Sequence, residues 1–87
     1  MVSLSDMITG PQIRAARGLL EWSRARLSSQ SSVSASVIER LENSRHGARE
    51  TTLAAITTTL VNGGVEFIES VGVKLRADKV DENLVNR

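Results

Sequence analysis

The chain has 87 residues, no cysteine and a formal net charge of +1 at neutral pH. A chain of this length forms one small domain that buries only about 60–65% of its unfolded surface, so association with a second copy would add stability. Without cysteine, it can hold neither a disulfide framework nor a thiolate zinc site. No apolar stretch approaches the roughly 20 residues that span a bilayer, so we expect a soluble, cytoplasmic protein with no membrane partner.

The charge is distributed unevenly along the chain. Residues 11–49 hold seven arginines and three acidic residues, a net charge of +4, whereas the remainder holds four basic and seven acidic residues, a net charge of −3. A basic segment of this kind favours phosphate binding, because each neutralised phosphate releases condensed counterions. The alternative is an ordinary solvated surface of mixed charge.

The first 22 residues predict an arm followed by a helix. Residues 1–9 have no clear apolar period, so we expect an N-terminal arm there. Gly10 and Pro11 then mark the start of a helix, because proline is tolerated in a first helical turn. The apolar residues that form one face of this helix are Ile13, Ala16 and Leu20. The pattern ends near Glu21 or Trp22.

Two short helices are predicted on either side of a polar, serine-rich turn. Ser23 is a suitable N-cap for a helix over 24–30, and Ser34 for a helix over 35–43. The apolar anchors are Leu27, Val33, Ile38 and Leu41. The opposite face of the later helix carries Ser34, Ala35, Ser36, Glu39, Arg40 and Asn43. This helix-turn-helix pattern suits a helix laid in the major groove of DNA, where side chains near its start reach base edges.

The C-terminal part predicts one more helix and then two strands. Leu53, Ile56 and Leu60 give the helical spacing, and Asn62-Gly63-Gly64 is a stop signal. Beyond it the apolar period is near 2, with alternating side chains at Val65, Phe67, Val71, Val73 and Leu75. A lone hairpin is marginal in water and has unpaired edges, so we predict that segment 63–77 forms a homodimer through these side chains. Residues 78–87 are a polar tail that frays or forms a short helix.

Over roughly residues 10–62 the sequence resembles the XRE family, the Cro and phage-repressor type of helix-turn-helix regulators. The resemblance is carried by the run from Gln12 to Arg17, Leu20, Trp22-Ser23, Leu27, Val33-Ser34, Ile38, Leu41-Glu42, Leu53, Ile56 and the run from Gly64 to Ile68. It implies a mainly α, lambda-repressor-like DNA-binding domain of four to five helices with a short C-terminal β hairpin or strand pair. It also implies a double-stranded DNA partner, no cofactor, and a bacterial, nucleoid-associated protein of the kind found on mobile elements.

The resemblance assigns roles to individual residues. Arg24, the first residue of the second helix, would contact phosphate, for which its five donors are suited. Bases would be read from the exposed face of the third helix by Ala35, Ser36, Glu39 and Arg40, and Ser34 at the start of that helix would also lie at the DNA. Of these, Arg40 is suited to guanine O6 and N7, and Ala35 to a thymine methyl. Asn43 and Arg45 would contact phosphate without reading sequence. Arg17 and Glu42 would form a partly buried, structural ion pair.

The chain departs from the family pattern at five positions. The family has glutamine, two alanines and a glycine where this chain has Arg24, Ser28, Ser31 and Ser32, and a second glycine where this chain has Ser44. Ser32 occupies a turn position that commonly needs a positive φ, so serine there costs on the order of 1 kcal/mol.

These features together predict a sequence-specific transcriptional regulator. We expect a repressor that binds paired half-sites of an operator as a homodimer and can regulate its own gene. The alternative is an antitoxin-like DNA-binding protein whose C-terminal segment binds a protein partner, and a third possibility is an adaptor that binds no DNA. The sole histidine, His46, has no partner at metal-ligand spacing, and no serine has a nucleophile motif, so we expect neither a metal site nor an enzyme. Trp22 is expected in or beside the core.

Overall fold

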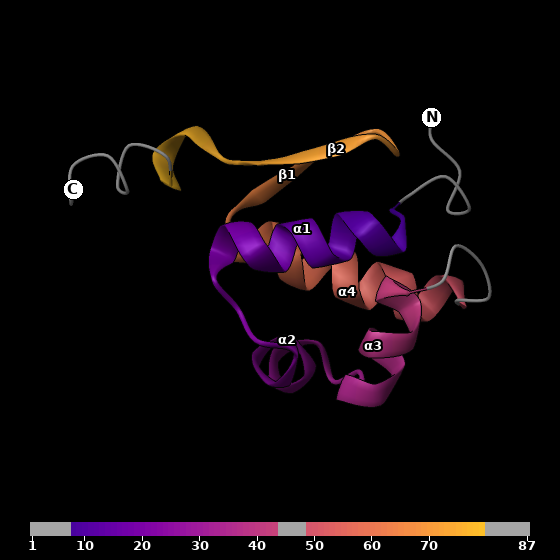
Figure 1. The fold of residues 1–87 in the computed structure, drawn as a ribbon. Coiled ribbons are helices and arrows are strands. Elements are labelled where there is room, and N and C mark those ends of the chain that lie inside the picture. The colour runs from indigo at the N-terminus through magenta and orange to yellow at the C-terminus, as the bar shows by residue number, and fades with distance from the viewer. Residues whose placement is uncertain (1–7, 44–48, 80–87) are drawn as a thin grey trace.

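Figure 1 shows the fold in a computed structural model, which describes residues 8–43 and 49–79. Within these ranges the elements are α1 (Gly10–Leu20), α2 (Arg24–Ser31), α3 (Ala35–Glu42), α4 (Glu50–Gly63), β1 (Val65–Ile68) and β2 (Gly72–Leu75), and residues 77–79 are again helical. The predicted mainly helical fold with a C-terminal β hairpin is confirmed. No helix in the described part of the chain is both long and apolar enough to cross a membrane.

Side chains of serine and threonine begin the first three helices. The Ser23 hydroxyl accepts a hydrogen bond from the Arg26 amide, and the Ser34 hydroxyl accepts one from the Val37 amide, as the sequence predicts. Thr9 caps α1 in the same way and forms a reciprocal capping box with Gln12. The sequence analysis placed Thr9 in the arm and missed this cap.

α1, α2 and α4 end where the backbone takes a positive φ, whereas α3 ends at Asn43 with φ of −103°. Glu21 follows α1 with φ of 59°, Ser32 follows α2 with φ of 63°, and Gly64 follows α4 with φ of 126°. The sequence predicted the positive φ at Ser32. It is an unfavourable conformation for a residue with a Cβ, whereas glycine adopts it freely. Gly64 meets the same requirement without that cost.

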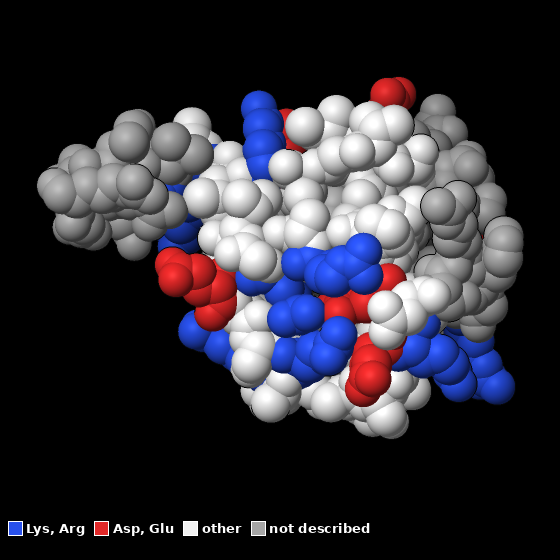
Figure 2. All heavy atoms as spheres, in the orientation of Figure 1, with Lys and Arg blue, Asp and Glu red and all other residues white. Residues whose placement is uncertain are grey.

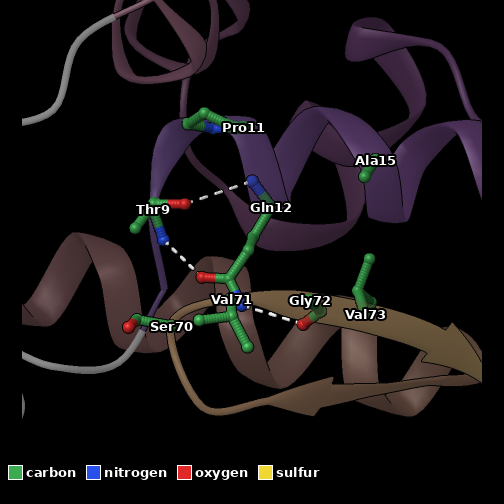
Figure 3. A pocket seen from close by; sticks show the side chains of 8 residues that line it. All are labelled: Thr9, Pro11, Gln12, Ala15, Ser70, Val71, Gly72 and Val73. Carbon is green, nitrogen blue, oxygen red and sulfur yellow. Dashed lines mark hydrogen bonds between the residues drawn. The ribbon is translucent and has the colours of Figure 1, made fainter.

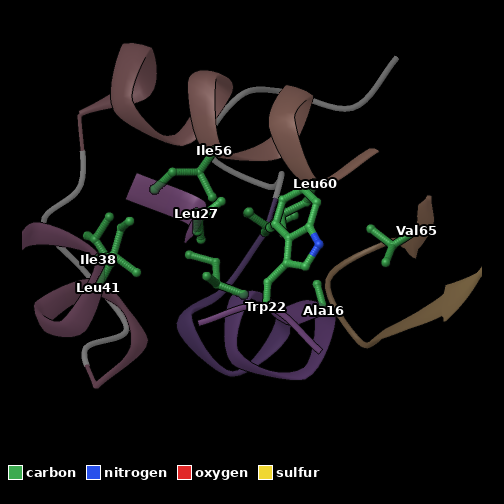
Figure 4. Close-up of a cluster of buried hydrophobic side chains, with 10 residues drawn as sticks. Ala16, Trp22, Leu27, Ile38, Leu41, Ile56, Leu60 and Val65 are labelled. Carbon is green, nitrogen blue, oxygen red and sulfur yellow. The ribbon is translucent and has the colours of Figure 1, made fainter. Parts of the chain in front are cut away.

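The core lies where the helices and β1 meet, as Figure 4 shows. Its buried apolar members are Ile8, Ile13, Ala16, Trp22, Leu27, Ile38, Leu41, Ile56, Leu60 and Val65. Trp22 is 8% exposed, in agreement with its predicted place in or beside the core. Ile8 belongs to the core although the sequence placed it in the arm; residues 1–7 of that arm lie outside the described ranges.

The hairpin covers the core with one face. β1 and β2 pair in antiparallel register, with Val65 opposite Leu75 and Phe67 opposite Val73. Phe67, Val73 and Leu75 are half-buried against the core cluster, and Val65 is fully buried. In Figure 1 the hairpin lies on one side of α1 and α4, while α2 and α3 lie on the other.

This packing gives the alternating apolar residues of the hairpin a role within one chain that the sequence did not predict, while association with a second copy stays a prediction. Val65 is 0% exposed and cannot reach another chain while the fold is intact, and Phe67, Val73 and Leu75 pack on their own core. The period of 2 therefore reflects burial within one chain. Of the five predicted dimerisation residues, Val71 alone is exposed, at 79%.

One buried side chain anchors the hairpin to the start of α1. The Gln12 amide nitrogen donates to the carbonyl oxygens of Glu69 and Gly72, at 2.9 Å each, and its oxygen accepts from the Thr9 amide at 2.8 Å. Figure 3 shows this side chain beside a shallow pocket between α1 and the hairpin turn. Each polar atom of the buried amide is thus bonded, which fixes the turn against the helix.

Candidate nucleic-acid interface

The exposed face of α3 carries the four residues predicted to read bases. Ala35, Ser36, Glu39 and Arg40 are all exposed. Ile38 and Leu41 are buried on the opposite side of the helix and hold it on the core. Because successive residues of a helix are about 100° apart, the exposed set forms one continuous strip from the N-terminus of α3 along its outer side.

The N-terminal end of this strip is polar and small. Ser34 uses its hydroxyl to cap the helix, and that oxygen also lies 3.3 Å from the Ser36 hydroxyl. The Ser34 hydroxyl therefore already accepts a hydrogen bond within its own helix, so the Ser36 hydroxyl is the better placed of the two to contact DNA. Ala35 has only a methyl group, so the backbone at this end can approach a flat surface closely.

At the C-terminal end of α3, Asn43 makes a capping contact that the sequence did not predict, and its contact with phosphate stays a prediction. The Asn43 side-chain nitrogen donates to the Glu39 carbonyl oxygen at 3.0 Å, and its backbone amide ends the helix. Asn43 is exposed, but its main donor group caps α3 rather than pointing freely outward. Arg45 and His46 lie outside the described residues.

Below the strip, a buried carboxylate joins three elements. Glu42 has a fully buried side chain at the end of α3. The Arg17 Nε donates to its Oε2 at 2.6 Å and the Arg17 Nη2 donates to its Oε1 at 2.9 Å, which forms the ion pair that the sequence predicted. The Arg17 Nη1 donates to the Trp22 carbonyl oxygen at 3.0 Å, so this arginine also fixes the link between α1 and α2.

A second arginine shares the same carboxylate. The Arg24 Nε donates to Glu42 Oε1 at 3.0 Å, while its side chain remains 39% exposed. The sequence assigned Arg24 to phosphate contact alone and did not predict this bond. The bond uses Nε, and within the described residues neither terminal nitrogen of the guanidinium, beside the N-terminus of α2, has a hydrogen-bond partner.

The two arginines determine the ionisation of Glu42. Burial alone raises the pKa of a carboxyl group, but the hydrogen bonds from Arg17 and Arg24, together with their charges, outweigh burial and hold the pKa of Glu42 below its ordinary value. The hydrogen bond to Glu42 likewise raises the pKa of Arg17. The cluster is thus fully ionised at neutral pH, with one negative and two positive charges.

Arg14 adds a contact that the sequence analysis missed. Its Nη1 donates to the Glu42 carbonyl oxygen at 3.1 Å, so a cation on α1 meets the C-terminal end of α3. Such a cation satisfies a free carbonyl and interacts favourably with the helix dipole. The available signal was the spacing of Arg14 and Arg17, which places them on neighbouring positions of one helical face.

Basic side chains gather around this cluster. Figure 2 shows them over the side of the molecule where α2 and α3 lie, with acidic atoms in their midst, while the surface near the hairpin is mostly uncharged. Arg26 lies over the Trp22 ring, 4.7 Å from its centroid, so it covers the core edge while its charge stays in solvent. Among the described residues, these side chains form a basic surface over α2 and α3.

Comparison with known protein families and with curated proteins finds no match to this chain. Among the described residues, no three histidine, cysteine, aspartate or glutamate side chains are close enough together to hold a metal ion. The function is therefore inferred from the surface around α2 and α3.

Proposed function

We propose that the protein is a sequence-specific regulator that binds double-stranded DNA with α3 in the major groove. The observation that carries this proposal is the division of α3 into two faces. One face is locked by Ile38, Leu41 and Glu42, which are at most 5% exposed. The other offers small side chains near the helix start and two charged ones a turn later, a size gradient that lets the N-terminal end enter a groove.

The surroundings of α3 supply the phosphate contacts that such a position requires. Arg24 begins α2, where the first backbone amides of the helix have no partner within it. A guanidinium held at such a helix start meets a phosphate with both hydrogen bonds and charge. The ion pair with Glu42 fixes the guanidinium in place, so little side-chain entropy is lost on binding.

In this proposal the protein binds paired half-sites as a homodimer and represses transcription by occupying an operator. Its proposed location is the cytoplasm, on the nucleoid. Symmetric sites require two copies of α3 about 34 Å apart, one turn of DNA. Each half-site alone then binds weakly, and the pair binds strongly.

The direct test is selection of bound duplexes from a random pool, followed by titration of the selected sequence at several salt concentrations. The logarithm of the affinity is expected to fall linearly with the logarithm of salt concentration, with a slope near −0.9 per phosphate contact. A selected sequence that binds no better than scrambled duplex would overturn the proposal. Retention of a protein in place of DNA would instead favour the antitoxin-like or adaptor alternative.

Substitutions separate base contacts from phosphate contacts. Arg40→Ala is expected to lose about 1–3 kcal/mol of discrimination at one operator position. Arg45→Ala, at a position predicted from the sequence to contact phosphate, is expected to weaken binding to all duplexes alike and to reduce the salt slope by about 1. Equal, uniform losses in both variants, with the base preference of Arg40→Ala intact, would show that Arg40 does not read bases.

A further inference from the structure

Two neighbouring residues on the exposed face of α3 have opposite hydrogen-bonding properties toward a base pair. Arg40 carries donors only, and Glu39 at neutral pH carries acceptors only. Both side chains are exposed, and their positions differ by about 100° around the helix axis, so they meet different base edges. The proposed DNA-binding surface therefore carries a fixed pattern of hydrogen-bond polarity.

Glu39 is the unusual member of this pair. Within residues 8–43 and 49–79, no ion pair neutralises its carboxylate, whereas the carboxylate of Glu42, one turn further along α3, holds two arginines. Asn43 bonds the backbone oxygen of Glu39 and not its side chain. On a surface that faces phosphates, an unneutralised carboxylate is repelled by every duplex alike.

A particular base can offset this repulsion by donating a hydrogen bond. In the major groove only cytosine N4 and adenine N6 carry amino donors. In an A·T pair the amino group lies between two acceptors, adenine N7 and thymine O4, which oppose the second carboxylate oxygen on either side, while in a C·G pair the amino group has the O6 acceptor of guanine on one side only. The chemistry of a free carboxylate thus favours cytosine.

We propose that Glu39 is a specificity-determining residue that selects cytosine at one position of each half-site, while Arg40 selects guanine at another. This inference rests on the proposed DNA-binding function and extends it to the bases read. Glu39 acts mainly by exclusion: it lowers the affinity for every duplex that lacks an amino group at the position it faces. A carboxylate in this position lowers the affinity for DNA in general and increases the discrimination between bases.

The test compares wild-type protein with Glu39→Gln, which keeps the shape of the side chain and removes its charge. Glutamine pairs with adenine N6 and N7. In selection from random duplexes, wild-type protein is expected to enrich cytosine at one position. Glu39→Gln is expected to enrich adenine at that position instead, with a preference of adenine over cytosine of about tenfold. The variant is also expected to bind scrambled duplex more tightly than wild-type protein does.

Glu66→Gln is the matched control, because it changes net charge by the same amount on β1, across the molecule from α3. It is expected to leave the selected sequence unchanged. If wild-type protein selects a sequence but Glu39→Gln selects the same one, the role of Glu39 is wrong while DNA binding stands. If wild-type protein selects no sequence at all, both proposals fail.

Discussion

Glu42 shows how one carboxylate can organise a small domain. A buried carboxylate is costly by itself, and this one is compensated by three charged hydrogen bonds from Arg17 and Arg24. The two arginines come from α1 and α2 and the glutamate from α3, so the cluster fixes the mutual position of all three helices. A network of this kind contributes through geometry, because removing one member leaves the others uncompensated.

Glu42→Gln is expected to lower the free energy of unfolding by about 1–4 kcal/mol, since it leaves Arg17, only 16% exposed, without a counter-charge. Urea unfolding at neutral pH measures the change. Glu39→Gln on the exposed side of the same helix is the control and should alter stability little. Equal urea midpoints for the two variants would show that the Glu42 cluster does not stabilise the fold.

The lowered pKa of Glu42 gives the protein a specific sensitivity to acid. A carboxyl group whose pKa is lower in the folded state contributes stability above its unfolded pKa, about 4.5, and loses that contribution as the pH falls through the folded value. The stability difference between wild-type protein and Glu42→Gln should thus be constant above about pH 5 and shrink below about pH 4. Urea midpoints across this range measure it. A stability difference that grows on acidification would show that the pKa of Glu42 is not lowered in the folded state.

At the scale of elements, the turn between α2 and α3 holds a serine in an unfavourable backbone conformation, and a substitution can relieve this strain. Ser32 has φ of 63°, which glycine adopts without steric penalty. Ser32→Gly is expected to raise the free energy of unfolding by about 0.5–1 kcal/mol. Ser29→Gly, three residues earlier inside α2, is the matched control and should lower it by a similar amount. Thermal unfolding measures both variants. A change of the melting temperature in the same direction for both would show that the backbone conformation of Ser32 does not explain the effect.

The elements differ in how far sequence alone predicts them. Leu27, Ile38 and Leu41 were predicted as anchors because a helix with one apolar face has a local period, and their burial confirms it. The contacts of Gln12 and Arg14 could not be predicted in this way. They join residues that are 57 and 28 positions apart in the chain, and no local pattern records which distant carbonyl a polar side chain reaches.

The candidate site shows the same division. The exposed strip of α3 follows from its period, whereas the bond of Arg24 to Glu42 depends on how α2 and α3 pack together. The packing of the hairpin on its own core could not be predicted for a related reason. An alternating strand pattern shows that one face is buried, but not whether the chain itself or a second copy buries it.

At the scale of the whole molecule, the hairpin closes a core that the four helices leave open. Val65 is fully buried, and the inner side chains of both strands pack on the cluster formed by the helices. Gln12 bonds the hairpin turn to α1, so the hairpin is held at its tip as well as along its inner face. The region that the sequence divides into a DNA-binding domain and a C-terminal segment thus shares one core.

Truncation after Gly64 is therefore expected to unfold the chain, not merely to abolish association between copies. Each fully buried apolar side chain contributes about 1.5–3 kcal/mol. The removal of Val65 and of the half-buried Phe67, Val73 and Leu75 thus takes several kcal/mol from a domain whose total stability is about 5–15 kcal/mol. Circular dichroism should show no cooperative melting for the truncated chain, while Val71→Ser, at a residue 79% exposed, should melt as the intact protein does. A truncated chain that melted cooperatively at the wild-type temperature would show that the helices form a complete core without the hairpin, and segment 63–77 would again be free to serve a second copy.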